Sequence, residues 1–314
     1  MAYDTMKARY LSLHPLLLWQ YMERPIDWSR HFGRAAPLEV EVGFGNGEFL
    51  LREAQQHPDW NLVGIELAWA SVQRGLRKIA QTRTSNVRLL LVEAQTALER
   101  LFIPQSIQRL YALFPCPWPK ERHTKHRLFG RGFLALLNSR LAPHGEVQIV
   151  TDYQPYLHWI LTQLPGMGFT AHWTPVPPRF STKYERKWRA EGQQEFYDLR
   201  LHKTQHLTLP VKEDVTLQTH QVPHFDPTHA PSGILLQGVI TVACKEWLYD
   251  PTRQKGLLCV FVIEDGFRQD FWLEIAHSDD HWVIRPAYGC GIIPTVGVQC
   301  ALDAVRDLTQ HGTA

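Results

Sequence analysis

The chain has 314 residues, 44% of them hydrophobic and 20% charged, which is an ordinary globular composition with room for two domains. No run of about 18 apolar residues occurs, which argues against a membrane span. The short apolar run near the start lacks a small-residue cleavage site, so we expect no signal peptide and a cytoplasmic location. The five cysteines form no C-x-x-C pair, so we expect reduced thiols and no metal site.

The net charge of +2 conceals two parts of opposite sign. Residues 1–204 hold 26 Lys and Arg against 18 Asp and Glu, whereas residues 205–314 hold 7 against 13. This asymmetry suggests that the first part contacts a polyanion and the second does not. The alternative is that the two parts differ in charge by chance.

Strands alternate with helices from residue 37 onward. We expect strands at 38–45, 61–67, 87–94, 109–115 and 146–152, and helices at 48–57, 70–83 and 126–141. This rhythm predicts βαβ units in a doubly wound, Rossmann-like α/β sheet that is mostly parallel, with helices on both faces. Residues 196–203 alternate apolar and polar side chains, which is typical of an antiparallel edge strand.

The strand–helix pattern stops after residue 203. Residues 205–232 are rich in Pro, His and Thr, and we predict a linker there. Several β-rich runs and a final helix at 298–310 then predict a small α+β domain at 233–314, following a first domain at 1–204. No motif in the second domain indicates chemistry.

A glycine turn joins the first predicted strand to the first helix, with the sequence EVGFGNG at residues 41–47. Glycines there let the backbone pass close to a ligand. A dinucleotide fingerprint would have its third glycine at position 48, where this chain has Glu48. Gly43, Gly45 and Gly47, preceded by the acid Glu41, suit a ligand that has an ammonium group and no pyrophosphate. S-adenosylmethionine is such a ligand.

Acids also end the next two predicted strands. Glu66 follows Gly47 by 19 residues, at the place where an acid hydrogen-bonds ribose hydroxyls in such folds. Glu93 ends the third strand and is expected to face the adenine end of the same crevice. Glycines at such a turn are often only structural, but the two added acids favour a cofactor site.

A stiff cationic segment, FPCPWPKERHTKHR, follows the fourth strand at residues 114–127. The loop after a strand of an open α/β sheet borders the ligand crevice. Trp118 offers a flat face for stacking on a base. Four cations suit phosphate contacts, namely Lys120, Arg122, Lys125 and Arg127. The alternative is a solvated helix start with a buried tryptophan.

A second group of cations and aromatic residues spans residues 179–189, with five cations against one acid. This composition again suits phosphate contacts. Asp152, at the end of the fifth strand, is expected to complete the rim of the site. The alternative for Asp152 is that it caps the following helix.

These motifs together resemble the bacterial tRNA (guanine-N7)-methyltransferases from residue 37 to residue 203. The resemblance rests on Glu41 with its glycines, Gly64-Ile65-Glu66, Phe114-Pro115-x-Pro117-Trp118-Pro119-Lys120-x-Arg122-His123, Thr151-Asp152 and Thr182-Lys183-Tyr184-Glu185. It implies a class I methyltransferase fold and S-adenosylmethionine held by Glu41, Glu66 and Glu93. The implied target is a guanosine in the tRNA variable loop. The residues expected to bind this tRNA are Lys120, Arg122, His123, Lys125, Asp152, Thr182, Lys183, Tyr184 and Glu185.

The chain departs from this family at one position. The family has Phe-Pro-Asp-Pro-Trp, with an aspartate regarded as both cofactor-binding and catalytic, where this chain has Cys116. We therefore take Cys116 and Asp152 as the catalytic candidates, with Cys116 also beside the cofactor. Guanine N7 carries a free lone pair, so its methylation needs positioning more than a base. A neutral thiol stabilises the developing positive charge less than a carboxylate, so we expect a reduced rate.

Two other functions stay open at this point. One is a tRNA-binding protein that keeps the fold but has lost catalysis at Cys116. The other is a methyltransferase that acts on a different substrate. We expect a monomer or homodimer in each case.

Overall fold

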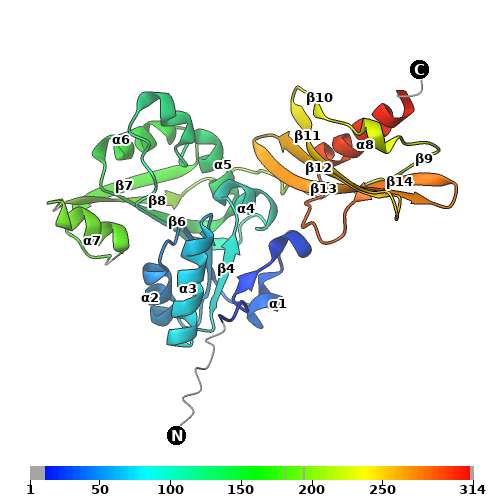
Figure 1. Ribbon diagram of the computed structural model, residues 1–314. Coiled ribbons are helices and arrows are strands. Elements are labelled where there is room, and N and C mark those ends of the chain that lie inside the picture. Colours follow the sequence, from blue (N-terminus) through cyan, green and yellow to red (C-terminus); the bar gives the residue numbers. More distant parts are fainter. Residues whose placement is uncertain (1–10, 181, 194, 312–314) are drawn as a thin grey trace, which may run out of the picture. The chain divides into compact units, whose positions relative to one another are not determined.

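The computed structural model describes residues 11–180, 182–193 and 195–311 (Figure 1). The chain forms two compact units, with unit 1 ending at Lys212 and unit 2 beginning at Glu213. Within the described ranges, no helix is both long enough and apolar enough to cross a membrane.

Unit 1 is built on an eight-stranded sheet with the order β1-β4-β3-β2-β5-β6-β8-β7. The neighbours from β1 to β6 pair in parallel, whereas β8 runs antiparallel to both β6 and β7. The predicted doubly wound, mostly parallel sheet is confirmed. Its strands are β1 Leu16–Leu17, β2 Leu38–Val42, β3 Asn61–Glu66, β4 Val87–Leu91, β5 Ile107–Leu113, β6 Leu141–Thr151, β7 Phe169–Val176 and β8 Phe196–Lys203.

The helices of unit 1 form two groups. Helices α2 and α3 contact each other and β3, and α4 and α5 form a second contacting pair. Because the strand order reverses between β2 and β5, right-handed crossovers place these pairs on opposite faces of the sheet. The helices are α1 Trp28–Phe32, α2 Glu48–Gln56, α3 Trp69–Thr82, α4 Ala94–Arg100, α5 Arg131–Arg140, α6 Gln154–Gln163 and α7 Lys183–Ala190, with 3-10 turns at Trp19–Tyr21 and Glu121–His126.

The strand expected at the sheet edge lies one position inside it. Residues 196–203 form β8, which is antiparallel as predicted, but β7 is the outermost strand. Most β7 side chains are exposed, and Pro175 lies within the strand. Proline is tolerated at a sheet edge because it has no N–H to donate. Without an apolar pattern, β7 gave no signal in the sequence.

The segment expected as a linker, residues 205–232, is divided between the units. The buried guanidinium of Arg140 donates to the carbonyls of Leu98, Leu209 and Pro210, at 2.7 to 2.8 Å. A buried cation needs such acceptors, and these bonds hold residues 205–212 on unit 1. Strand β9, His220–Val222, pairs with β14 of unit 2. The boundary therefore falls after Lys212 instead of at residue 204.

Unit 2 is a six-stranded antiparallel sheet with the order β10-β11-β12-β13-β14-β9 and one helix packed against it. The helix, α8 Val296–His311, contributes Val298, Ala301, Leu302 and Val305 to the core. This is the expected small α+β domain, with β9 added from upstream. The remaining elements are β10 Gly233–Leu236, β11 Ile240–Asp250, β12 Lys255–Glu264, β13 Phe267–Ser278, β14 His281–Pro286 and a 3-10 turn at Pro227–His229.

Candidate active site

The glycine turn between β2 and α2 depends on three left-handed residues. Gly43, Gly45 and Gly47 have φ values of 72°, 55° and 70°. Residues other than glycine rarely adopt this backbone conformation, which explains why glycine occupies every second position of the turn. The turn lies at the carboxyl end of β2, where the sequence analysis predicts the cofactor site.

Glu41 lies directly beneath this turn and is 3% exposed. Its Oε2 atom is buried and has no hydrogen-bond partner among the described residues. Burial raises the pKa of Glu41 to about 8, and the negative charge of Glu53 contributes in the same direction. Glu41 lines a pocket together with the glycine turn. A buried carboxyl oxygen without a partner is suited to pairing with a cation brought by a ligand.

Glu66, at the end of β3, is bound to the same turn. Its Oε2 accepts a hydrogen bond from the backbone N–H of Gly45 at 3.0 Å. Its Oε1 accepts from the N–H groups of Leu67 and Ala68, at 2.9 and 3.0 Å. These bonds fix the carboxylate at the tip of β3, where its remaining lone pairs are available to hydroxyl donors.

Glu93 follows β4 and begins α4. Its Oε2 accepts from the N–H of Thr96 at 2.9 Å and from the Thr96 hydroxyl at 3.3 Å. Glu93 is therefore the N-cap of α4, and it is exposed. Since β2, β3 and β4 are neighbours in the sheet, the three glutamates lie along one edge of it.

The loop after β5 is held in a strained conformation around Cys116. Phe114 and Trp118 have positive φ values of 57° and 43°, although neither is glycine. Such backbone costs about 1–3 kcal/mol per residue and persists only where surrounding contacts enforce it. Cys116 is exposed within this loop. The sequence had indicated the loop but not its strain.

Arg127, which the sequence analysis included among the phosphate-binding cations, contacts the backbone of this loop around Trp118. Its Nε donates to the carbonyl of Pro117 at 2.9 Å, and its Nη2 donates to the carbonyl of Trp118 at 3.3 Å. The guanidinium lies 5.6 Å from the ring centre of Tyr156 and 5.0 Å from that of Trp159. This arginine is thus turned inward and clamps the loop.

The other cations of this segment are directed outward. Lys120, Arg122 and Lys125 are exposed, in and beside the 3-10 turn at 121–126. His123 accepts at Nε2 from Arg122 Nε, at 3.0 Å. The ring of Trp118 lies 5.6 Å from that of His123, so the tryptophan is partly engaged within the loop.

The tetrad at residues 182–185 forms a helix N-terminus. Thr182 caps α7 by accepting from the N–H of Glu185 at 3.2 Å. Glu185 is 2% exposed and accepts from the backbone N–H groups of Arg179 and Phe180. The T-x-x-E spacing is the signature of a capping box, which the sequence analysis did not identify. Tyr184 is 49% exposed, and the side chain of Lys183 lies outside the described residues.

Helix α7 is linked to the glycine turn by ion pairs. Arg186 Nη2 lies 3.0 Å from both carboxylate oxygens of Glu48, which also pairs with Lys78 at 3.1 Å. Thr182 and Tyr184 complete the pocket that Glu41 lines, and its volume is about 50 Å³. Sequence reasoning had noted Glu48 only as a missing glycine and did not foresee this link.

Asp152 lies at the end of β6 and is half-buried. Burial raises the pKa of its carboxyl, and this effect outweighs the opposing influence of Lys187. The N-cap of α6 is Tyr153, and no side chain caps that helix end. The structure therefore does not use Asp152 as a helix cap.

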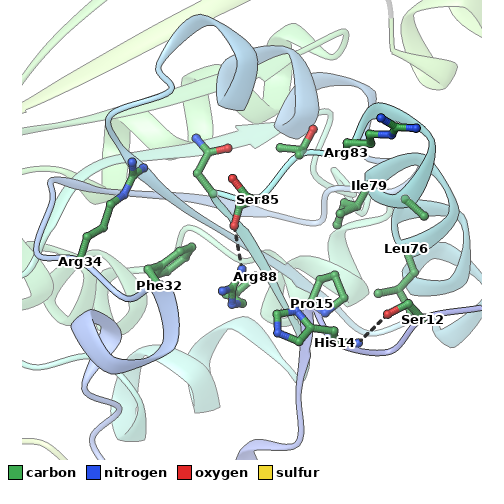
Figure 2. A pocket seen from close by; sticks show the side chains of 13 residues that line it. Ser12, His14, Pro15, Phe32, Arg34, Leu76, Ile79, Arg83, Ser85 and Arg88 are labelled. Atoms are coloured by element: carbon green, nitrogen blue, oxygen red, sulfur yellow. Dashed lines mark hydrogen bonds between the residues drawn. The ribbon is translucent and has the colours of Figure 1, made fainter.

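A larger cavity, of about 480 Å³, lies at the amino end of β4 (Figure 2). It is lined by Ser12, His14, Pro15, Phe32, Arg34, Leu76, Ile79, Ala80, Arg83, Thr84, Ser85, Asn86 and Arg88. Arg88 donates to the carbonyls of His31 and Ser85, which satisfies much of its guanidinium. The smaller pocket, in contrast, lies at the carboxyl ends of the strands, where ligands of such sheets bind. Among the described residues, no group of three or more His, Cys, Asp or Glu is arranged to hold a metal ion.

Residues 35–198 match the model of a family described as "Putative methyltransferase". A solved structure named "Structure of an antibiotic related Methyltransferase" aligns with a TM-score of 0.45 and 17% identity, over 56% of this chain and 92% of that one.

Two relatives whose names specify a reaction also align with this chain. A tRNA (guanine-N(7)-)-methyltransferase of Chlorobium phaeobacteroides is 42% identical over 173 residues, which is 55% of this chain and 85% of the relative. One of Thermotoga maritima is 30% identical over 296 residues, which is 92% of this chain and 95% of the relative. The second alignment reaches across most of unit 2. This chain therefore belongs to the tRNA (guanine-N7)-methyltransferase family.

Proposed function

We propose that the protein transfers a methyl group from S-adenosylmethionine to N7 of a guanosine in the variable loop of tRNA. The observation that carries this proposal is the buried, unpartnered Oε2 of Glu41 beneath a turn of three left-handed glycines. The names of the aligned relatives support the reaction and the substrate.

The residues at the strand tips fit the parts of this cofactor. Glu41 would hold the ammonium group, because its buried Oε2 has no other partner in the part of the chain that the structure describes. Glu66 would hold the ribose hydroxyls, and Glu93 would lie at the adenine end. S-adenosylmethionine supplies an electrophilic methyl group on sulfur. A pocket of about 50 Å³ is well below the usual size of small-molecule sites, about 300–1,000 Å³, so Thr182 and Tyr184 must withdraw when the cofactor binds.

The reaction demands orientation of the guanine and stabilisation of positive charge. N7 attacks with a lone pair and needs no base, so the chain must hold the base in line with the methyl group. We propose that the loop clamped by Arg127 provides this alignment, with Cys116 at the reacting end. Asp152 would supply the negative charge that a thiol does not, once the product becomes cationic.

The tRNA would lie across the exposed cations of this rim. Lys120, Arg122 and Lys125 point outward, and His123 lies beside them. Thr182 and Glu185 shape the start of α7, so their contribution to tRNA binding would be to present Lys183 and Tyr184. Phosphate contacts of this kind weaken as salt concentration rises.

The test uses labelled cofactor and matched RNAs. The protein is incubated with methyl-tritiated S-adenosylmethionine and unmodified tRNA, and the RNA is digested to nucleosides. Label should appear in 7-methylguanosine and should vanish with a tRNA that carries 7-deazaguanosine at the target position. Bound but unlabelled tRNA would instead indicate a tRNA-binding protein, and label in another nucleoside would indicate another substrate.

We further propose that the protein acts in the cytoplasm as a monomer or homodimer. Light scattering on the purified chain tests the oligomeric state, and a trimer or larger assembly would contradict it. Fractionation of cells with an antibody against the chain tests the location.

A further inference from the structure

The sheet of unit 2 has one face that α8 does not cover. The core residues Val260 on β12 and Leu273 on β13 point toward α8, together with Val298 and Leu302 of the helix. Neighbouring residues of a strand point to opposite faces. The alternate residues of β12 and β13 therefore form a second face, here called the open face. Among residues 213–311, α8 is the only α-helix.

Aromatic side chains occupy the middle of the open face. Phe261 on β12 and Trp272 on β13 are each half-buried, and both alternate with core residues. Cys259 pairs with Trp272, and Phe261 pairs with Asp270, so the two rings lie on adjacent central strands. Tyr288 follows the end of β14 by two residues and is 82% exposed, and the N–H of its neighbour Ala287 donates to the carbonyl of Trp272 at 2.9 Å. Two partly exposed rings on neighbouring antiparallel strands, with an exposed tyrosine beside them, form a platform on which bases can stack.

Cations surround these rings. Lys245 Nζ lies 5.0 Å from the ring centre of Phe261, and the guanidinium of Arg268 lies 5.3 Å from it. The guanidinium of Arg285 lies 4.8 Å from the ring of Tyr288. Unit 2 is acidic overall, yet these three cations and Lys255 are four of the seven Lys and Arg in residues 205–314.

The ion-paired side chains of the open face carry a net positive charge. Asp270 pairs with both Lys245 and Arg268. Glu274, which is 3% exposed, pairs with both Lys255 and Arg285. Each acid thus pairs with two cations, which leaves two positive charges over, and the exposed Glu246 beside Lys245 reduces this excess to one.

We propose that the open face of unit 2 binds unpaired nucleotides of the same tRNA that unit 1 methylates. This inference rests on the proposed function. Rings flanked by excess cations suit bases and phosphates together, which is the chemistry of single-stranded RNA. The alignment with the Thermotoga maritima relative extends over most of this unit, so the unit is shared with a tRNA (guanine-N(7)-)-methyltransferase.

The experiment measures tRNA affinity of the full chain at several salt concentrations. Tyr288→Ala should weaken binding at least about fivefold, because a base–aromatic stack is worth about 1–3 kcal/mol. Arg268→Gln should reduce the slope of log affinity against log salt by about one. Val239→Ala is the matched control, because Val239 is 87% exposed between β10 and β11 and should leave affinity unchanged.

A further variant changes the charge in the opposite direction. Glu246 is exposed on β11 beside Lys245 and offsets part of the positive excess, so Glu246→Gln should tighten tRNA binding about twofold. Wild-type tRNA affinity in both the Tyr288 and the Glu246 variants would overturn the inference. That result is also the one expected if the open face binds another protein surface instead of RNA. A wild-type chain that does not bind tRNA would instead refute the proposed function.

Discussion

Glu41 gives the sharpest prediction, because its carboxyl is neutral when the cofactor is absent. With a pKa of about 8, only about a tenth of the Glu41 carboxyls are ionised at pH 7. Pairing with an ammonium group requires the ionised form, and reaching it at pH 7 costs ~1.4 kcal/mol. Cofactor affinity should therefore rise about tenfold from pH 6 to pH 7. It should level off near pH 8, where an α-amino group of pKa about 7.7–8.0 begins to lose its own proton.

Isothermal titration calorimetry in buffers of different ionisation enthalpy tests this directly. Wild-type protein should release close to one proton per cofactor bound at pH 7. Glu41→Gln should bind more weakly, by about 2–5 kcal/mol at pH 8, with little pH dependence and no proton release. Equal proton release in the two proteins would refute the assignment of the ammonium group to Glu41.

The same shift predicts an effect on the stability of the cofactor-free protein. The pKa of Glu41 rises from 4.5 to about 8 on folding, so the folded state holds its proton where the unfolded chain has lost it. Stability therefore falls as pH rises through this interval and stays low above it. Between pH 5 and pH 9, the free energy of unfolding should therefore fall by about 4 kcal/mol more in the wild-type protein than in Glu41→Gln, as measured by urea unfolding. Parallel pH profiles for the two proteins would contradict the burial argument.

Three further predictions concern the loop and the helix around the pocket. Arg127→Met should lower kcat by about 10- to 100-fold with unchanged cofactor affinity, because it releases the loop. Added guanidinium should restore part of the rate; a variant with wild-type kcat would remove Arg127 from the mechanism. Cys116→Asp should raise kcat at least about tenfold in a single-turnover methylation assay, and no increase would mean that Asp152 already supplies the charge. Glu48→Gln should speed cofactor association about two- to fivefold in stopped-flow fluorescence, because the half-exposed pair with Arg186 is worth less than about 1 kcal/mol. An unchanged association rate would show that α7 does not limit entry.

Much of the site could be read from the sequence because its residues follow strands. Parallel strands place their carboxyl ends at one edge, so the acids at 41, 66 and 93 had to lie near one another once the strands were recognised. The three alternate glycines likewise indicated a turn whose backbone passes close to a ligand, because glycine has no side chain to prevent it. The T-x-x-E capping box was also visible in the sequence at Thr182 and Glu185, but the adjacent cations drew the interpretation toward RNA.

Other features depended on contacts between distant segments. The inward orientation of Arg127 requires the carbonyls of a strained turn and two aromatic rings of α6. The pair between Glu48 and Arg186 joins residues 138 positions apart. Neither contact leaves a periodic signal, because each depends on the packing of whole elements.

The sequence by itself determined the doubly wound fold and the residues at its strand ends, including the acids and the cationic segment, because local periodicity and strand ends are properties of short segments. Only the tertiary structure decided which cations face solvent, how far α7 closes the pocket and where unit 1 ends. Those outcomes follow from burial: a guanidinium such as Arg140 or Arg127 is fixed by carbonyls that the chain brings to it from elsewhere.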